Sequence, residues 1–332
     1  MKILVIRFSS IGDIVLTTPV LRALKKQIPA VELHFLTKAG FKTVVANNPH
    51  IDRVFTIDSR ISEVLQELKS EQYDYIIDLH KNARTLALRI KLGKPVYTFP
   101  KLNWQKLLLV KLKKNFLPKL HIVERYFIAV EKLGVVNDTL PSEFYISEKD
   151  EVNLLEKFGL QTKSFVTIAI GAQFATKRMP QNKLKEIIEK IELPIVLVGG
   201  PMDISFADSL LSMLPDQAIY SACGTYNLAQ SASIVRQSKV LLTNDTGMMH
   251  IASCFQLPIV SVWGNTVPAL GMYPYFPGNP ELFSIHEVKG LNCRPCSKIG
   301  FQKCPKGHFN CMNLQDSAAI SKEIKTRVGV SQ

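Results

Sequence analysis

Apolar runs of strand length alternate with helical patterns along most of this 332-residue chain. In the first half the pattern predicts strands at residues 2–7, 31–36, 53–57, 75–78 and 95–98, with helices at 13–27, 39–47, 61–70 and 82–91. In the second half it predicts strands at 165–170, 194–198, 218–221, 240–243 and 259–263, with helices near 181–191, 204–214, 227–237 and 246–254. Because strands that alternate with helices form parallel sheets covered on both faces, the sequence predicts an α/β protein.

The alternation occurs twice, on either side of a polar break near residues 157–164. We therefore expect two Rossmann-like, doubly wound domains, residues 1–160 and 161–332, that face each other across a cleft. Ligands of such sheets bind beyond the carboxyl ends of the strands, so the loops that follow strands are where chemistry is expected.

The first strand ends in small residues and a carboxylate: Ser9, Ser10, Gly12 and Asp13. The small residues leave room for a ligand close to the backbone, although the segment lacks the glycine pattern of a dinucleotide-binding loop. Asp13 has two interpretations, a cap of the following helix and a general base directed into the cleft, and one residue can serve as both.

The strand at 240–243 runs into Asp245, Thr246 and Gly247 at the start of a helix, with His250 one turn further on. Free backbone N–H groups and the positive end of the helix dipole suit a diphosphate here. The alternative is an ordinary helix cap with a buried histidine.

Two further loops follow strands of the second half. Lys177 and Arg178 come after the strand at 165–170 and form either a phosphate site or a solvated loop. Asp203 follows Gly199-Gly200 after the strand at 194–198, where it either accepts hydrogen bonds from a ribose or caps the next helix.

Together these four segments resemble glycosyltransferase family 9, the lipopolysaccharide heptosyltransferases. The run from Ile6 to Pro19 is similar to the family's first motif, and Asn244-Asp245-Thr246-Gly247 with His250 is similar to its donor-phosphate motif. The order and spacing of Lys177, Gly199-Gly200 and Asp203 between them also match, so the resemblance spans nearly the whole chain.

The resemblance implies a B-type glycosyltransferase fold, with an N-terminal acceptor-binding domain and a C-terminal domain for the nucleotide sugar. It implies inverting transfer without a metal, from a donor that is typically ADP-heptose to the inner core saccharide on lipid A. It places the catalytic base on Asp13, a phosphate-binding lysine on Lys177 and the ribose contact on Asp203. The diphosphate contacts fall on Asp245, Thr246 and Gly247, with His250 beside them, and Ser9, Ser10 and Gly12 line the first strand end. In family members the final helix packs back across the first domain, which we expect here for residues 316–328.

The net charge of +13 is concentrated in one segment: residues 79–123 contain eleven lysines and arginines but no Asp or Glu. Within it, residues 104–114 read as a basic amphipathic helix, suited to an anionic membrane surface through Lys106, Lys111, Lys113 and Lys114. The alternative is a core helix with a solvated lysine face. The segment has no nucleic-acid motif, so no nucleic-acid partner is expected.

The sequence contains no apolar run long enough for a membrane span or a signal peptide, so we expect a cytoplasmic protein at the inner membrane face, with reduced cysteines. Cys293, Cys296, Cys304 and Cys311, with His308 among them, form a cluster open to three interpretations: a structural zinc site, free thiols or disulfides.

The functional prediction is a glycosyltransferase that needs no cofactor. Three alternatives remain at this stage. The first is a glycosyltransferase of the same fold with another nucleotide sugar or acceptor. The second is a protein that binds a nucleotide or lipid A without catalysis. The third is a non-hydrolysing nucleotide-sugar epimerase, which shares the fold but is not suggested by the first motif.

Overall fold

The computed structural model describes residues 1–329. Its contacts divide the chain into two compact units. The first unit contains Met1–Leu102 and Leu120–Tyr145, and the second contains Asn103–Lys119 and everything described from Ile146 onward. The second unit thus begins earlier than the expected boundary at residue 160. Val152, Leu154 and Leu160 are all buried in its core.

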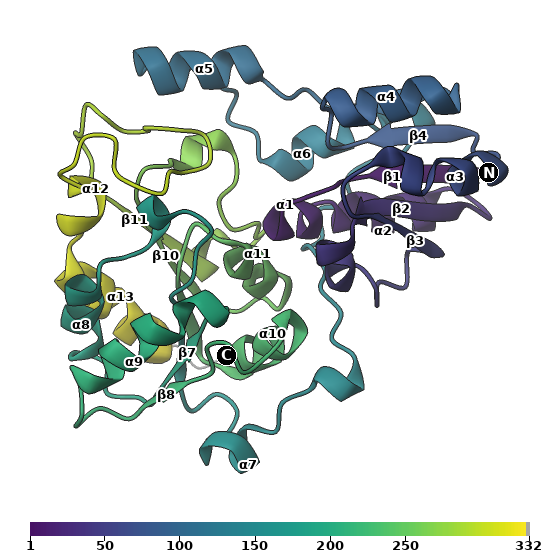
Figure 1. The fold of residues 1–332 in the computed structure, drawn as a ribbon. Helices are drawn as coiled ribbons and strands as arrows, with labels where there is room; N and C mark the ends of the chain where they lie inside the picture. Colours follow the sequence, from purple (N-terminus) through teal and green to yellow (C-terminus); the bar gives the residue numbers. More distant parts are fainter. Residues whose placement is uncertain (330–332) are drawn as a thin grey trace. The chain divides into compact units, whose positions relative to one another are not determined.

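The first unit is built on a parallel sheet of five strands in the order β3-β2-β1-β4-β5 (Figure 1). These strands are β1 (Lys2–Ile6), β2 (Glu32–Lys38), β3 (Arg53–Ile57), β4 (Tyr75–Asp78) and β5 (Val96–Thr98). Its helices are α1 (Ile11–Val15), α2 (Thr18–Gln27), α3 (Leu65–Ser70), α4 (Ala83–Leu92) and α6 (Ile122–Phe127). The residues of β1 from Ile3 to Ile6 are completely buried, as expected of a central strand covered on both faces.

The second unit has a parallel sheet of six strands in the order β11-β10-β9-β6-β7-β8. These strands are β6 (Val166–Ala169), β7 (Ile195–Val198), β8 (Ile219–Ser221), β9 (Val240–Asn244), β10 (Ile259–Trp263) and β11 (Phe283–Glu287). Its helices are α5 (Asn103–Leu112), α7 (Leu154–Phe158), α8 (Gln181–Ile188), α9 (Ile204–Ser212), α10 (Leu228–Gln237), α11 (Gly247–Cys254), α12 (Asn310–Asn313) and α13 (Ser317–Gly329).

Successive residues of the central strands enter opposite cores. Ile195 and Leu197 of β7 pack into one cluster with helices α8, α9 and α13, whereas Val196 and Val198 pack into the other with α10 and α11. This alternation follows from the two-residue period of a strand. The prediction of an α/β fold with two parallel, helix-covered sheets is thus confirmed.

The predicted helix at 13–27 is interrupted in the structure. Helix α1 ends at Val15 and α2 begins at Thr18, with Pro19 in its first turn. Proline has no N–H to continue the first helix, and the Thr17 and Thr18 hydroxyls donate to the carbonyls of Ile14 and Val15. The expected helix at 39–47 is a 3₁₀ segment, Ala39–Val44.

The last helix, α13, packs against α8 and beside β9 and β10 of the second unit (Figure 1). That it also packs across the first domain stays a prediction. Its buried residues Ile320 and Ile324 belong to that unit's apolar core, so its apolar face is already covered there. Among residues 1–329, no helix is both long and apolar enough to span a bilayer.

Candidate active site

The strand order of each sheet reverses at one place, between β1 and β4 in the first unit and between β6 and β9 in the second. Numbered in chain order within each unit, the first sheet has the strand order 3-2-1-4-5 and the second has 3-2-1-4-5-6, the order of the Rossmann fold. Open sheets of this kind bind ligands outside the carboxyl ends of the strands at such a reversal. All four loops at these two places carry polar side chains.

At the end of β1, Asp13 forms an ion pair with Arg7. The Arg7 Nη2 lies 2.6 Å from Asp13 Oδ1, and the remaining guanidinium donors bond the carbonyls of Ser9 and Leu79. Burial lowers the pKa of Arg7, but Asp13, Tyr126 and Asp78 together raise it by more, so the pKa of Arg7 lies above its ordinary value. Arg7 is therefore a fixed cation that orients the Asp13 carboxylate.

Asp13 also caps its own helix. Its Oδ2 accepts hydrogen bonds from the Ser10 hydroxyl at 2.8 Å and from the Ser10 N–H at 3.3 Å. Gly12 is buried beneath this turn, and about a quarter of the Asp13 side chain stays accessible. The two interpretations of Asp13 are thus compatible in the structure, since the carboxylate caps the turn while part of the side chain stays accessible.

Polar residues from the end of β4 and from α6 complete this region. His80 stacks on Phe8 with ring centroids 5.1 Å apart, and the Lys101 Nζ donates to the His80 carbonyl. Burial, then the neighbouring cations Arg7 and Lys101, lower the pKa of His80 to about 4. Its ring is therefore neutral at physiological pH.

Helix α6 adds two buried groups, the side chains of Arg125 and Tyr126. Both interact electrostatically with Asp13. The Arg125 Nε and Nη2 and the Tyr126 hydroxyl have no hydrogen-bond partner among the described residues. Buried polar groups in native proteins are nearly always paired, so this is a place where a polar ligand is expected. The sequence patterns do not single out His80, Arg125 or Tyr126, although all three lie in or next to the acid-free segment.

In the second unit, Lys177 and Asp245 meet. The Lys177 Nζ lies 2.6 Å from Asp245 Oδ2 and also donates to the Asp245 carbonyl at 3.2 Å. The same Oδ2 accepts a hydrogen bond from the Thr266 hydroxyl at 2.8 Å. Lys177 comes from the loop after β6 and Asp245 from the loop after β9, so the contact spans the point where the strand order reverses.

Helix α11 begins at Gly247 immediately after this pair. Thr246 is its N-cap, with its hydroxyl 3.2 Å from that of Thr243. The first backbone N–H groups of a helix have no partner within it and carry the positive end of its dipole. His250, in the same helix, is 3% exposed.

Asp203 is held inside its own loop. Its Oδ2 accepts from the Gly200 N–H at 2.9 Å, and its Oδ1 lies 3.1 Å from Arg178. A Cβ at Gly171 would lie 2.4 Å from Asp203 Oδ2, so this glycine permits the close packing. Asp203 is 5% exposed and joins the Gly200 turn to Arg178. It stands at the N-cap position of α9, but its side chain makes no cap hydrogen bond to that helix.

The loop that carries Lys177 is fastened to the cysteine-bearing segment. The Thr176 N–H and hydroxyl both donate to the Phe301 carbonyl at 3.0 Å, and the Phe301 N–H donates to the Thr176 hydroxyl at 2.8 Å. Thr176 is 2% exposed. Residues 293–311 thus help to position Lys177.

The four clustered cysteines carry thiols without disulfides. The Cys296 thiol donates to the Cys293 carbonyl, and the Cys293 sulfur lies 3.9 Å from the His308 Nε2. Burial raises the pKa of Cys311 to about 12, and the other three cysteines add to this effect. Among the described residues, their sulfurs do not form a compact set of ligands such as a zinc ion requires.

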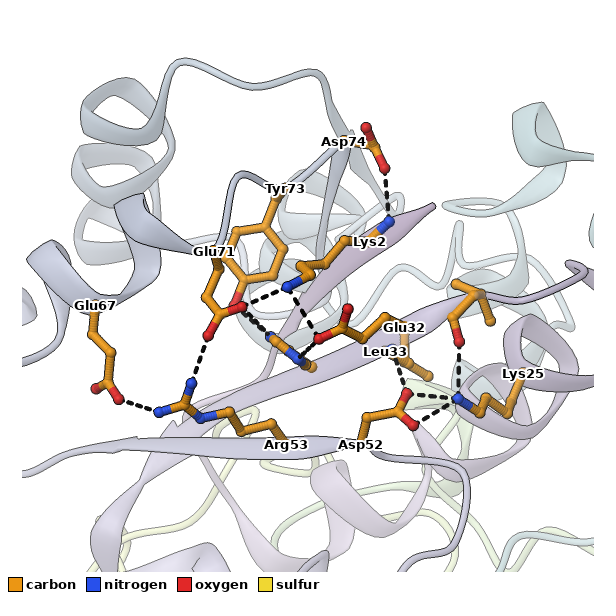
Figure 2. A network of polar contacts seen from close by, with 12 residues as sticks. Lys2, Lys25, Glu32, Leu33, Asp52, Arg53, Glu67, Glu71, Tyr73 and Asp74 are labelled. Carbon is orange, nitrogen blue, oxygen red and sulfur yellow. Dashed lines mark hydrogen bonds and ion pairs between the residues drawn. The ribbon is translucent and has the colours of Figure 1, made fainter.

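The one compact set of potential ligands within residues 1–329 is Glu32, His34 and Glu71. Glu32 begins β2 and Glu71 precedes β4, so the set lies at the amino ends of these strands, whereas Asp13 follows the carboxyl end of β1 (Figure 2). The Lys2 ammonium occupies the position between the carboxylates, 3.0 Å from Glu32 and 2.6 Å from Glu71. This network is therefore neutralised internally.

The lysines of the basic segment differ in their surroundings. Lys113 Nζ donates to the carbonyls of Val110, Cys293 and Pro295, so it ties the end of α5 to the cysteine-bearing segment. Lys111 and Lys114 are exposed, as are Trp104 and Phe116.

Comparisons with known proteins agree with this architecture. The sequence model of glycosyltransferase family 9 (heptosyltransferase) matches residues 61–293. Lipopolysaccharide heptosyltransferase 1 of Campylobacter coli is 24% identical over 293 residues, which cover 80% of this chain and 84% of that protein.

Two solved structures share the fold. The family 9 glycosyltransferase of Veillonella parvula superposes with a TM-score of 0.79 at 22% identity, covering 98% of this chain and 97% of that one. The E. coli heptosyltransferase solved with ADP-2-deoxy-2-fluoro heptose gives 0.68 at 17% identity, covering 98% and 99%. On the family match and the fold, this chain belongs to glycosyltransferase family 9 and is a glycosyltransferase with the B-type fold.

Proposed function

We propose that this chain transfers heptose from ADP-heptose to the lipopolysaccharide inner core on lipid A, with inversion at the sugar and without a metal. The observation that carries the proposal is the pair of polar sites at the two strand-order reversals. One offers a carboxylate suited to a base, and the other offers a lysine beside a helix N-terminus. The names of the relatives, which are heptosyltransferases, and the ADP-heptose analogue bound to a neighbour support the donor.

Asp13 is the proposed general base. An acceptor hydroxyl loses its proton to the Asp13 carboxylate as its oxygen attacks the anomeric carbon of the donor. The bond from that carbon to the diphosphate breaks in the same displacement, so the configuration inverts. Arg7 holds the carboxylate in place through the 2.6 Å ion pair.

Lys177 and the start of α11 are proposed to bind the diphosphate. Two donors of the Lys177 ammonium are directed at Asp245, which leaves a third for a phosphate oxygen. The N–H groups of the first turn after Thr246 add further donors to the charge that develops on the leaving group. These groups supply the stabilisation that a divalent cation gives in metal-dependent transferases.

The acceptor is proposed to bind at the first unit. Arg125 and Tyr126 offer buried donors without partners near Asp13, and His80 offers a neutral ring nitrogen. An oxygen-rich saccharide can satisfy these groups. Ser9, Ser10 and Gly12 leave the space beside the carboxylate in which its hydroxyl would lie. For Asp203, by contrast, the internal hydrogen bonds favour a structural role over a ribose contact.

A donor panel tests the proposal. Purified protein is incubated with core-truncated lipopolysaccharide and ADP-heptose, UDP-sugars or GDP-sugars, with and without EDTA, and the acceptor is weighed by mass spectrometry. We expect a mass gain of one heptose with ADP-heptose that EDTA does not prevent. A gain only with another donor would refute the sugar assignment. Donor binding without any gain would favour a binding protein.

The enzyme is further proposed to work as a peripheral protein on the cytoplasmic face of the inner membrane, through the basic segment around α5. Lys111 and Lys114 are exposed beside the exposed apolar residues Trp104, Leu112 and Phe116. Such a surface suits an anionic bilayer. Lys106 belongs to the same helix, whereas the contacts of Lys113 favour a structural role.

Vesicle sedimentation across a salt series tests this surface. Replacing Lys106, Lys111 and Lys114 by Gln should weaken binding to anionic vesicles and flatten its dependence on salt, because each lysine contributes roughly 1 kcal/mol near such a surface. Turnover on a short soluble acceptor should be unchanged. Equal binding of wild type and variant at every salt concentration would refute the surface.

A structural zinc on Cys293, Cys296, Cys304 and Cys311 is the remaining proposal from the sequence. Such a site requires each of the four sulfurs to lie about 2.3 Å from the zinc ion. Metal analysis of protein purified without chelator tests it. One zinc per chain, lost when Cys296 and Cys311 are replaced by Ser, is the supporting result, and a metal-free, folded protein is the contrary one.

A further inference from the structure

A surface pocket of about 250 Å³ lies on the first unit between the ends of α3 and α4. Lys69 and Gln72 line it from the end of α3, Tyr73 from the segment before β4, and Lys91 and Lys94 from the end of α4 and the turn before β5. We call Lys69, Lys91 and Lys94 the lysine pocket. It lies at the amino ends of the strands and shares no residue with the candidate active site.

The charge of the lysine pocket is not neutralised. Within the described part of the chain, none of its three lysines forms an ion pair. Two acidic residues close to the pocket residues in sequence are engaged elsewhere: Glu67 and Glu71 pair with Arg53, and Glu71 also pairs with Lys2 (Figure 2). A small pocket lined by three lysines without ion pairs is suited to an anion.

Helix α4 carries an apolar stripe on its outer side. Leu86 and Ile90 lie one turn apart and are 49% and 72% exposed, whereas Thr85 and Leu88 are buried against the unit. Arg84 and Lys91, seven residues apart, lie together on one side of the helix, next to the stripe rather than on either side of it. An exposed apolar stripe beside basic residues is typical of a helix that lies in a membrane surface.

We propose that α4 lies in the surface of an anionic bilayer and that the lysine pocket binds the phosphate headgroup of a lipid. Lysine binds phosphate as a point charge without a fixed geometry, so three lysines suit a headgroup that approaches from the bilayer. The volume is below the roughly 300–1,000 Å³ of sites for larger small molecules. The adjacent apolar stripe favours a lipid over a free phosphate ion, because only a lipid has acyl chains that Leu86 and Ile90 could contact.

This surface is separate from the basic segment around α5. It belongs to the first unit and includes none of the lysines at 106, 111, 113 or 114. The test of this surface measures lipid binding and does not depend on sugar transfer. Failure of the proposed reaction and failure of this inference are therefore distinguishable.

The test measures binding of the full chain to vesicles of phosphatidylcholine that contain either phosphatidic acid or phosphatidylserine at equal negative charge. Phosphatidic acid presents an exposed monoester phosphate, so wild type should bind those vesicles more tightly. Replacing Lys69, Lys91 and Lys94 by Gln should abolish the preference and weaken binding on the order of tenfold to a hundredfold. Replacing Leu86 and Ile90 by Ser should weaken binding to both vesicles.

A matched control removes the same charge elsewhere. Lys149, Lys190 and Lys322 are exposed lysines of the second unit, and replacing them by Gln should preserve the lipid preference. Thermal melts confirm that each variant is folded, and Lys91→Arg should retain binding. Wild-type preference in the pocket variant would overturn the proposal. The proposal would also be overturned if inorganic phosphate competed as well as the phosphatidic acid vesicles, because the bilayer would then add nothing to the affinity.

Discussion

Asp13 is both a helix cap and the proposed base, and its geometry allows the two roles to be separated. Asn retains an oxygen for the Ser10 N–H and hydroxyl, so the turn that depends on these bonds should survive. An amide cannot take the proton of the acceptor hydroxyl.

We therefore expect Asp13→Asn to bind ADP normally, to melt within a few degrees of wild type and to lose at least about a hundredfold in kcat. Calorimetry with ADP and a turnover assay measure the two effects. Near-normal kcat would show that capping is the only role of Asp13.

Lys177 gives a second prediction at this scale. Lys177→Gln removes the cation proposed to meet the diphosphate, and loss of one such donor typically costs about 10²–10³ in rate. Lys183→Gln is the matched control, since Lys183 pairs with Glu186 on α8. A similar loss of rate in both variants would point to a general charge effect rather than to a phosphate contact.

His80 predicts a dependence of stability on pH. Its pKa is about 4 in the folded protein against an ordinary 6.5, because burial disfavours the charged ring. Between these values the unfolded chain binds a proton that the folded chain does not, so the free energy of unfolding falls as pH drops from 6.5 towards 4.

Urea titrations over this range measure the effect, with His80→Gln as the comparison. The variant should be less stable at neutral pH but should lose less stability on acidification. His34 and His286, whose pKa values are also lowered, are present in both proteins and cancel in the difference. Parallel curves for the two proteins would contradict the assignment.

At the scale of elements, Lys113 fastens α5 to the segment that carries the cysteines. Its ammonium lies 2.6 Å from the Pro295 carbonyl and 2.7 Å from that of Val110. Lys113→Gln should lower the free energy of unfolding by about 1 kcal/mol, the net value of such hydrogen bonds. Lys114→Gln, one residue on, should leave it unchanged in denaturant titrations.

The elements were largely predictable from the sequence, because their apolar periods are strong. The interruption between α1 and α2 was missed, although Pro19 signals it, because the apolar pattern continues through the break. Strand β11 was also missed. All five of its residues are only partly buried, so it lacks the apolar run that marked the other strands.

The site was predictable to the extent that its residues follow strands. Asp13, Lys177 and Asp245 could be found in this way, and the structure joins Lys177 to Asp245. The partners of Asp203 could not, since a carboxylate after two glycines fits a ligand contact and a loop cap equally well. Arg125 and His80 depend on packing between distant segments, which a single sequence does not reveal.

At the scale of the whole molecule, the connectivity of the two units determines how the protein can be divided. The chain passes from the first unit to the second at residue 102, returns at 120 and leaves again after 145. A single cut near residue 145 therefore does not release an intact pair of halves, because the α5 segment would remain on the wrong fragment.

Separate production of the halves needs a different design. Leu102 would be joined to Leu120 by a short linker for the first half, and residues 103–119 would be appended to the second as a new terminus. Two fragments made in this way should each fold and should reconstitute activity when mixed, whereas fragments from the single cut should aggregate. The excursion of seventeen residues thus makes the enzyme a candidate for split-protein reconstitution only along a rewired chain.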